Sequence, residues 1–136
     1  MDYSQSCIAQ ILNEVKTIAL VGASARQDRD SFKVMESLLK NGYEVFPVNP
    51  YEEGNLILGQ ICYKDLSSIK KNIDMVDVFR AEDAIMEVTK QSIEIKAKVL
   101  WTQLGLVNED AAKLAEKAGL KVVMDRCPKK ELEKSN

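Results

Sequence analysis

The sequence predicts an α/β protein with a doubly wound parallel sheet in three layers, formed by residues 1–136 as one domain. Short apolar runs alternate along the chain with segments that carry apolar residues at helical spacing. No internal repeat, low-complexity tract or linker interrupts this alternation. Because right-handed crossovers connect such units, a parallel sheet covered by helices on both faces is the natural arrangement. A charged tail from residue 129 is expected to fray.

Six apolar runs are predicted to form the strands. The first run is apolar on both faces, as a central parallel strand requires, and the second ends abruptly at Asn49-Pro50. The third is a short stub and is predicted to be an edge strand. The six runs cover residues 17–22, 43–48, 61–63, 75–79, 98–102 and 120–124. We expect strand order 3-2-1-4-5-6, in which the chain reverses direction between the first and fourth strands.

The helical spacing of apolar residues predicts four helices and one brief helical turn. Ser4 is the expected N-cap of the first helix, Asp30 or Ser31 that of the second, Asp65 that of the brief turn, and Asn108 that of the last. Gly42 follows the second helix at a position where left-handed backbone is common. The helices and the turn cover residues 4–14, 31–41, 65–69, 81–96 and 108–118.

Composition excludes several kinds of function. The net charge of −2 gives no electrostatic footprint for nucleic acid. No apolar run is long enough to span a bilayer and no signal-peptide pattern opens the chain, so we expect no membrane partner and a cytoplasmic location. Histidine is absent, which excludes histidine acid–base catalysis, histidine metal ligands and a phosphohistidine within this chain. Cys7, Cys62 and Cys127 are too widely separated to suggest a disulfide framework or a zinc site.

The loop after the first strand is predicted to bind a phosphate. Gly22 ends that strand, a loop rich in charge follows, and then a helix begins, which is how doubly wound folds build their first phosphate site. Arg26, Arg29 and the Ser24 hydroxyl lie close to the helix N-terminus and suit a phosphate or pyrophosphate. In the alternative interpretation, both arginines pair with neighbouring aspartates in solvent.

The same loop is a poor dinucleotide fingerprint. Ser24 and Gln27 stand where the fingerprint needs glycines, and Asn49 stands near the place where an acidic residue would bind the ribose. NAD is therefore disfavoured. A P-loop is excluded because no G-K-[ST] sequence follows.

Residues at the carboxyl ends of other strands are expected to face Gly22 across one crevice. Phe79 and Trp101 either line this crevice or pack in the core. Cys127, next to an arginine, is either a thiol with a lowered pKa or a structural cysteine. Asp77 lies inside a predicted strand, where it either points out of the apolar face or accepts a backbone hydrogen bond.

Six segments carry a resemblance to a known family. They are V-G-A-S (21–24), R-D-S-F (29–32), P-V-N-P (47–50), D-M-V-D-V-F-R (74–80), W-T-Q-L-G (101–105) and V-M-D-R-C-P (123–128). With these motifs in order, the chain resembles the small bacterial and archaeal CoA-binding proteins, which look like stand-alone versions of the CoA-binding domain of the succinyl-CoA synthetase α subunit. The resemblance covers nearly the whole chain and implies a Rossmann-like domain.

The resemblance implies that three regions bind coenzyme A; no metal site is expected, because histidine is absent and the cysteines are widely separated. The family's nucleotide loop maps onto Gly22, Ala23, Ser24, Arg29, Ser31, Phe32 and Val34. Its second-strand turn maps onto Val48, Asn49 and Pro50. The groove wall maps onto Val78, Phe79 and Arg80, with Trp101, Gln103 and Gly105 nearer the pantetheine end. The synthetase's phosphohistidine lies in a second domain that this chain lacks, so the expected role is binding of CoA or an acyl-CoA without catalysis.

Two other functions are compatible with the sequence. One is an NAD(P)-binding oxidoreductase-type protein. The other is the CoA-binding subunit of a split acyl-CoA ligase, which would take its histidine from another chain. The expected protein partner is accordingly a second copy of the chain or a ligase-type protein. In a redox variant of the CoA-binding function, Cys127 forms a mixed disulfide with CoA.

Overall fold

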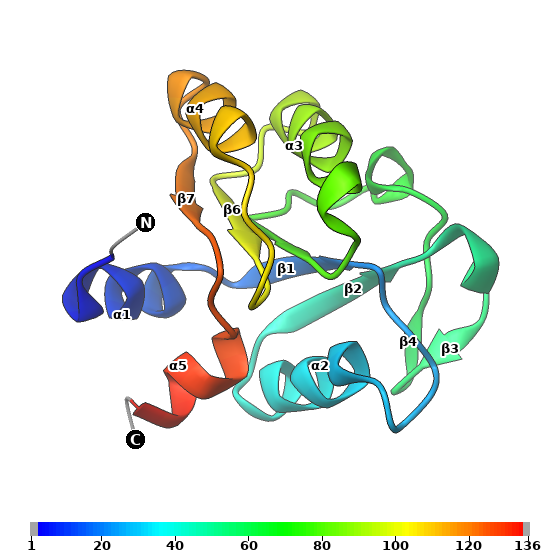
Figure 1. Cartoon of the computed structure of the whole chain (residues 1–136). Helices are drawn as coiled ribbons and strands as arrows, with labels where there is room; N and C mark the ends of the chain where they lie inside the picture. The colour runs from blue at the N-terminus through cyan, green and yellow to red at the C-terminus, as the bar shows by residue number, and fades with distance from the viewer. Residues whose placement is uncertain (1–2, 135–136) are drawn as a thin grey trace.

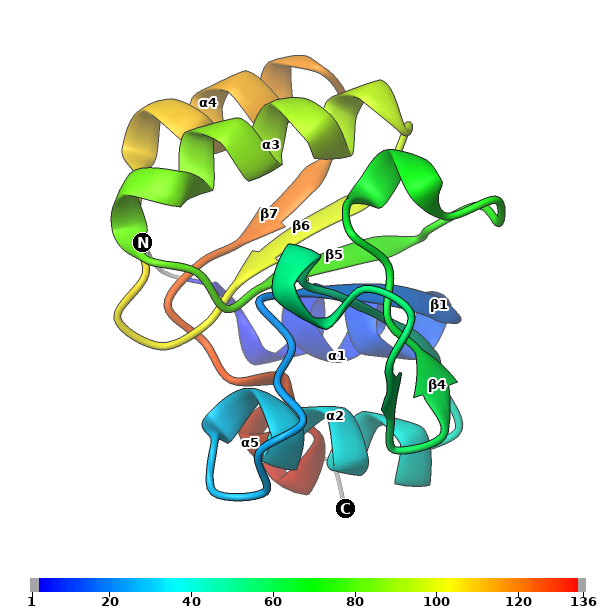
Figure 2. The ribbon, with the colours of Figure 1, turned by 90° about the vertical axis from the view of Figure 1, so that its right-hand side faces the viewer.

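A computed structural model describes residues 3–134, which fold into three layers. A parallel sheet lies between one helical layer of α3 and α4 and another of α1, α2 and α5 (Figures 1 and 2). Side chains of β1 alternate between the two layers: Ile18 and Leu20 pack in the cluster with α1 and α2, whereas Ala19 and Val21 pack in the cluster with α3 and α4. The predicted class, a doubly wound α/β fold, is confirmed.

The α-helices are α1 (Gln5–Glu14), α2 (Asp30–Lys40), α3 (Ile85–Glu94), α4 (Glu109–Lys117) and α5 (Pro128–Lys134). The strands are β1 (Thr17–Val21), β2 (Glu44–Val48), β3 (Leu56–Ile57), β4 (Gln60–Ile61), β5 (Met75–Val78), β6 (Val99–Thr102) and β7 (Lys121–Val123). Three short 3-10 turns are η1 (Pro50–Glu52), η2 (Leu66–Ser68) and η3 (Glu82–Ala84). None of the helices within residues 3–134 is long and apolar enough to cross a membrane.

The main sheet has the order β2-β1-β5-β6-β7, so the expected third strand at 61–63 is wrong in detail. Of that stub, Tyr63 forms a single parallel bridge to Val48 on the outer edge of β2. Ile61 pairs instead with Leu56 in the antiparallel hairpin of β3 and β4. The remaining order agrees with the prediction, including the reversal of direction between β1 and β5.

Pro47 gives the physical reason for the missing strand. The Tyr63 N–H donates to the Pro47 carbonyl at 2.9 Å, which shows that this residue turns its backbone groups toward the outer edge of β2. Proline has no N–H, so the edge lacks the donor with which a longer third strand would pair. The chain therefore makes one bridge at Tyr63 and leaves the sheet.

Residues 129–134 of the charged tail are folded, which corrects the expected fraying there, and residues 135–136 lie outside the described residues. Residues 128–134 form α5, with Pro128 at its start and Leu132 packed against the core. Ion pairs join Lys129 to Glu133 and Lys134 to Glu131 along the helix. One apolar side chain in a charged segment was too weak a signal for an amphipathic helix.

Three predicted helix caps are confirmed by side-chain oxygens that accept backbone N–H groups. Ser4 accepts from Cys7 at 3.1 Å. Asp65 accepts from Ser68 and Asn108 from Ala111 in the same way. Each of these contacts joins residues only three positions apart, so the local sequence is enough to indicate it.

Candidate functional site

The candidate site is centred on Gly22, where β1 ends beside β5 at the carboxyl edge of the sheet. The Phe79 N–H donates to the Val21 carbonyl at 2.7 Å and draws the two strand ends together. Gly22 has a φ of 94°, and a Cβ placed there would lie 2.1 Å from the Phe79 carbonyl oxygen. Only glycine allows both this backbone conformation and this close approach.

Two hollows flank Gly22, one on each side of the sheet edge. The α3-side hollow has a volume of about 560 Å³ and the α2-side hollow about 550 Å³, both in the usual range for ligand pockets. Gly22, Asn49 and Phe79 line both hollows. The α3-side hollow is also lined by Val21, Val48, Pro50, Tyr51, Lys64, Asp65, Arg80, Ala84, Glu87, Val88 and Gln91. The α2-side hollow is also lined by Ala23, Ser24, Arg26, Asp28, Arg29, Asp30 and Ser31.

The α2-side hollow contains the N-terminus of α2, and this end of the helix carries no side-chain cap. Arg29 is the N-cap residue and makes no capping hydrogen bond, so the expectation of an Asp30 or Ser31 cap is wrong. Arg26 forms an exposed ion pair with Asp28 at 3.2 Å. In contrast, the Arg29 guanidinium has no ion pair within the described part of the chain. The first turn and Arg29 are therefore available to an anion.

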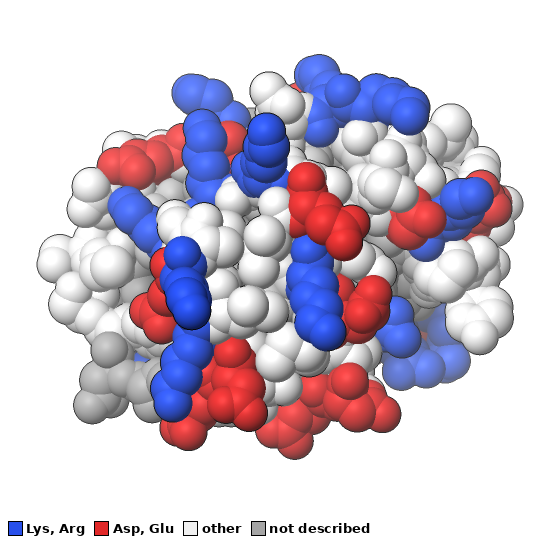
Figure 3. All heavy atoms as spheres, turned by 90° about the horizontal axis from the view of Figure 1, so that it is seen from above, with Lys and Arg blue, Asp and Glu red and all other residues white. Residues whose placement is uncertain are grey.

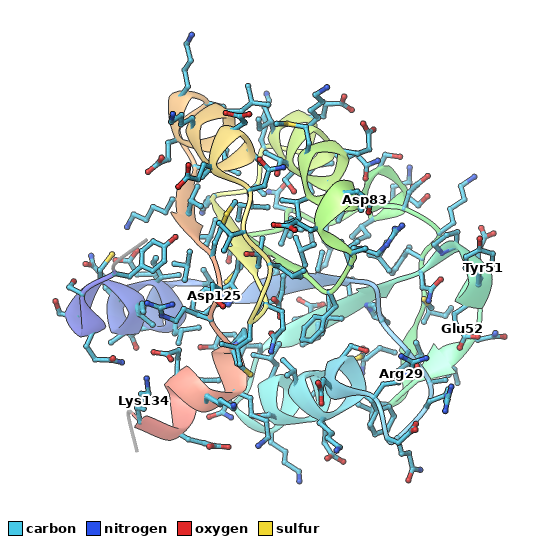
Figure 4. The ribbon with its side chains drawn as sticks, in the orientation of Figure 1. Arg29, Tyr51, Glu52, Asp83, Asp125 and Lys134 are labelled. Carbon is cyan, nitrogen blue, oxygen red and sulfur yellow. The ribbon has the colours of Figure 1, made fainter. Side chains whose placement is uncertain are left out.

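The α3-side hollow also presents two cations, although the charge of one of them, Lys64, acts on the neighbouring Asp65 carboxyl. Lys64 and Arg80 are exposed, and neither forms an ion pair among residues 3–134. Asp65, also on this wall, accepts hydrogen bonds from Ser68 and Ser67, and these hydroxyls lower the pKa of its carboxyl. Tyr51 is 91% exposed at the edge of the hollow. Figure 4 shows Tyr51 and Arg29 on the same side of the molecule, on different loops.

The structure divides the residues that the family resemblance suggested for CoA binding into two groups. Ten of them line one or both hollows: Gly22, Ala23, Ser24, Arg29, Ser31, Val48, Asn49, Pro50, Phe79 and Arg80. The other six line neither hollow: Phe32, Val34, Val78, Trp101, Gln103 and Gly105. Val34, Val78 and Trp101 are buried in the apolar clusters on the two faces of the sheet. Of the two alternatives for Trp101, lining the crevice or packing in the core, the structure shows the second.

Residues near the carboxyl ends of β6 and β7 form a separate set of contacts. The Gly105 N–H donates to the Asp125 carboxylate at 2.7 Å, and the Trp101 indole N–H donates to the Arg126 carbonyl at 2.9 Å. Asp125 has a positive φ of 61° and lies well away from Arg29 in Figure 4. This end of the sheet edge is closed by contacts within the protein.

Asp77 is fully buried in the middle of β5, on the face that packs against α1 and α2. Leu20 and Trp101 are its neighbours in the sheet. Both carboxyl oxygens lack a hydrogen-bond partner among the described residues, as does the buried Oε1 of Gln103. Burial raises the pKa of Asp77 well above its usual range, which favours the neutral acid. Both expectations for Asp77 are therefore wrong: it neither leaves the apolar face nor accepts a backbone hydrogen bond.

The three cysteines form neither a disulfide nor a metal-ligating cluster in the described part of the chain. Cys127 and Cys62 are buried, whereas Cys7 is exposed, and all three are free. Desolvation raises the pKa of the Cys62 thiol. No group of three or more potential metal-ligating side chains occurs within residues 3–134. The buried Cys127 lines neither hollow.

Several lining residues were missed by the sequence reasoning. Tyr51 lay in a segment predicted only as a loop, while Lys64 and Gln91 carry no motif. Part of the signal is topological, because η1 follows β2 at the carboxyl edge and Lys64 follows Tyr63, which bridges to the end of β2. Gln91, in the second half of α3, has no such signal. Over α3 and α4, Figure 3 shows basic and acidic side chains interspersed, with no single-sign patch of the kind that binds nucleic acid.

The fold and the switch-point groove define a Rossmann-like α/β domain. Comparison with known proteins then gives the family: the chain belongs to the CoA binding domain family, whose model matches residues 16–133. The resemblance seen in the sequence motifs is thereby confirmed.

Three relatives indicate how far the similarity extends. The uncharacterized protein YneT of Bacillus subtilis is 40% identical over 126 residues, which cover 93% of this chain and 92% of that protein. A hypothetical protein from Pyrococcus horikoshii has a solved structure with a TM-score of 0.91 and 43% identity, covering 97% of this chain and 92% of the other. The ADP-forming acetate–CoA ligase of Methanocaldococcus jannaschii is 31% identical over 61 residues, which are 44% of this chain but only 8% of the ligase.

Proposed function

We propose that the protein binds CoA or an acyl-CoA in the two hollows at the carboxyl edge of the sheet and performs no catalysis of its own. The observation that supports this most directly is the convergence of the family's motif residues. Ten residues from four separate segments of the sequence line the two hollows, in a chain whose family is described by CoA binding.

The chemistry of the lining suits a ligand with several phosphates and an apolar portion. The uncapped first turn of α2 and the unpaired Arg29 offer donors to a diphosphate. Lys64 and Arg80 supply further positive charge across Gly22. Apolar side chains on the α3 side, among them Val48 and Val88, provide the non-polar contact that such pockets use for binding.

The absence of catalysis is proposed from the residue types available. The chain of 136 residues contains no histidine, and no metal-ligating group occurs in its described part. Phosphoryl transfer through a phosphohistidine would therefore need another chain.

Isothermal titration calorimetry with CoA, acetyl-CoA, NADH and NADPH tests the proposal. We expect heat with the CoA forms, none with the dinucleotides, and stabilisation of about 2.7 kcal/mol when CoA is present at about a hundred times its Kd. No heat with either CoA form at micromolar protein would refute the proposal. Binding of NADPH that CoA fails to displace would favour the dinucleotide alternative.

Arg29 and Arg26 form a matched pair of variants for the same titration. Arg29→Gln removes an unpaired guanidinium and should weaken CoA binding several-fold, by about 0.5–1.5 kcal/mol, more at low salt than at high salt. Arg26→Gln removes a guanidinium that Asp28 already pairs, so its effect should be smaller. Equal effects of the two variants would show that Arg29 has no special place in the site.

A second candidate is a CoA-binding subunit of a split acyl-CoA ligase. It is favoured by the similarity to part of the acetate–CoA ligase, which places related sequence within a much longer enzyme. Pull-down from the native host would test it. Recovery of a ligase-type chain would support this candidate, and recovery of the protein alone or as a homodimer would count against it.

A further inference from the structure

The side chain of Asn49, the first residue after β2, forms two hydrogen bonds to backbone groups. Its Nδ2 donates to the Ala23 carbonyl at 2.8 Å, and its Oδ1 accepts the Tyr51 N–H at 2.9 Å. Its own backbone N–H donates to the Tyr63 carbonyl at 2.9 Å. Both ends of the carboxamide therefore form hydrogen bonds within the protein.

The partners of Asn49 belong to two different loops. Ala23 lies in the loop between β1 and α2, which forms the α2-side hollow, and Tyr51 lies in η1 at the edge of the α3-side hollow. Asn49 itself lines both hollows. The start of the β1–α2 loop is also bonded to the end of β2, because the Val48 carbonyl accepts the N–H groups of Gly22 at 2.9 Å and Ala23 at 3.2 Å.

Only asparagine suits both of these side-chain hydrogen bonds. The residue must donate in one direction and accept in the other from a short side chain, and an amide supplies both. Aspartate would place an acceptor against the Ala23 carbonyl. Serine can accept from the backbone N–H two residues later, but its hydroxyl is too short to replace the second contact.

We propose that Asn49 is a positioning residue, which locks the β1–α2 loop to η1 so that the two hollows are held ready as one site. This inference rests on the proposed function for its ligand. It differs from the role that the family resemblance implied, in which Asn49 contacts CoA directly. Loops fixed in advance reduce the ordering that binding would otherwise require.

The test combines amide hydrogen exchange of the free protein with CoA titration of two variants. Asn49→Ala removes both side-chain contacts, so exchange should rise at the Tyr51 N–H, which loses its acceptor, and at the hydrogen-bonded N–H groups of Gly22 and Ala23, whose loop loses the Asn49 amide. Asn49→Ser keeps an acceptor for the Tyr51 N–H, so exchange there should recover while that of the β1–α2 loop stays raised. For CoA affinity we expect a loss of about tenfold with alanine, carried by a less favourable binding entropy, and a smaller loss with serine.

Asn13→Ala is the matched control, because Asn13 is exposed on α1 and lines neither hollow. This variant should change neither exchange in the two loops nor affinity. The proposal is overturned if Asn49→Ala leaves exchange of the free loops at the wild-type rate, whether or not affinity falls, since a fall would then indicate direct contact. It is also overturned if exchange rises but CoA affinity stays unchanged. Failure of the wild-type protein to bind CoA would refute the proposed function, while the exchange measurement would still decide whether Asn49 joins the loops.

Discussion

The two edges of the parallel sheet use their polar groups differently. At the amino edge, Asp74 accepts the N–H groups of Lys16 at 2.8 Å and Thr17 at 3.3 Å, and it pairs with Lys98 at 3.5 Å. The Thr17 hydroxyl donates to the Asn72 carbonyl. At the carboxyl edge, an uncapped helix end and unpaired cations surround two hollows. Polar groups that satisfy one another hold the amino edge together, and the carboxyl edge around β6 and β7 is closed in the same way. Around the ends of β1 and β5, in contrast, the carboxyl edge leaves a helix end and cations available to a ligand.

Asp74, just before β5, and Asp77, inside it, show a similar contrast. The pKa of Asp74 is lowered, whereas the pKa of Asp77 is raised. Burial opposes ionisation of both carboxyls. Around Asp74 the Lys16 and Thr17 N–H groups and Lys98 outweigh burial and lower its pKa. Nothing in the described chain compensates Asp77, so its pKa is raised. Partners, more than burial, decide the charge of a carboxyl in this sheet.

The largest effect should come from Gly22→Ala, which acts on the carboxyl edge. The new Cβ would meet the Phe79 carbonyl at 2.1 Å in a left-handed backbone, and we expect a loss of roughly 3–5 kcal/mol of unfolding free energy, with weaker CoA binding. Gly42→Ala is the matched control, because Gly42 has a φ of 90° but no atom within 4 Å of its Cβ position. Urea unfolding should show only about 1–2 kcal/mol there. Equal losses would mean that backbone strain, and not the contact with Phe79, fixes Gly22.

Asp77→Asn should have the next largest effect, seen in the pH dependence of stability. A raised pKa in the folded state means that the contribution of Asp77 is full below the unfolded pKa of about 3.9 and is lost as pH rises through the folded pKa. The asparagine variant should lack this fall, so its urea midpoint should change less between about pH 4 and 8. Asp110→Asn, an exposed change on α4, controls for the altered net charge. Parallel pH profiles for wild type and Asp77→Asn would contradict a buried neutral acid.

Asp74→Ala should have a smaller effect of opposite pH dependence. A lowered pKa makes the contribution of Asp74 present above the unfolded pKa and lost as pH falls through the folded pKa. At neutral pH the variant should lose about 1–3 kcal/mol, and the difference from wild type should shrink in acid, while CoA affinity stays the same. For comparison, Glu44→Gln breaks the exposed pair with Lys71 and should cost at most about 1 kcal/mol. A large change in CoA affinity in Asp74→Ala would remove the distinction between the two edges.

The parts of the fold that depend on local chemistry were predictable from the sequence. The alternation of strands and helices, the cap at Asn108 and the switch point at Gly22 all follow from short-range patterns. Two predictions that were wrong, the strand at 61–63 and the frayed tail, depend on contacts between segments far apart in the sequence. The stub at 61–63 was expected to be a strand because its apolar pattern is visible, while the effect of Pro47 appears only when the two segments are paired. The tail became α5 because α1 and α2 offer Leu132 a surface that no local pattern reveals.

The site residues that belong to sequence motifs could be predicted. Those that reach the site from segments far from these motifs could not. The loop residues of the first strand end and the turn at Asn49 were expected at the groove, and they line it. Lys64 and Gln91 come from segments whose approach depends on how η2 and α3 pack. Strand register turns the Trp101 side chain into the core, and Gln103, just after β6, has a buried amide oxygen but lines neither hollow.

Pro47 also affects how the molecule meets other copies of itself. A parallel sheet ends in a row of backbone groups that can recruit a strand from another chain, which is a common route to aggregation. Here the outer edge of β2 is interrupted by an imino acid and then occupied by Tyr63, so a foreign strand finds neither a continuous row of donors nor free space. Pro47 thus limits the width of the sheet and keeps its outer edge from offering a continuous row of donors to another chain.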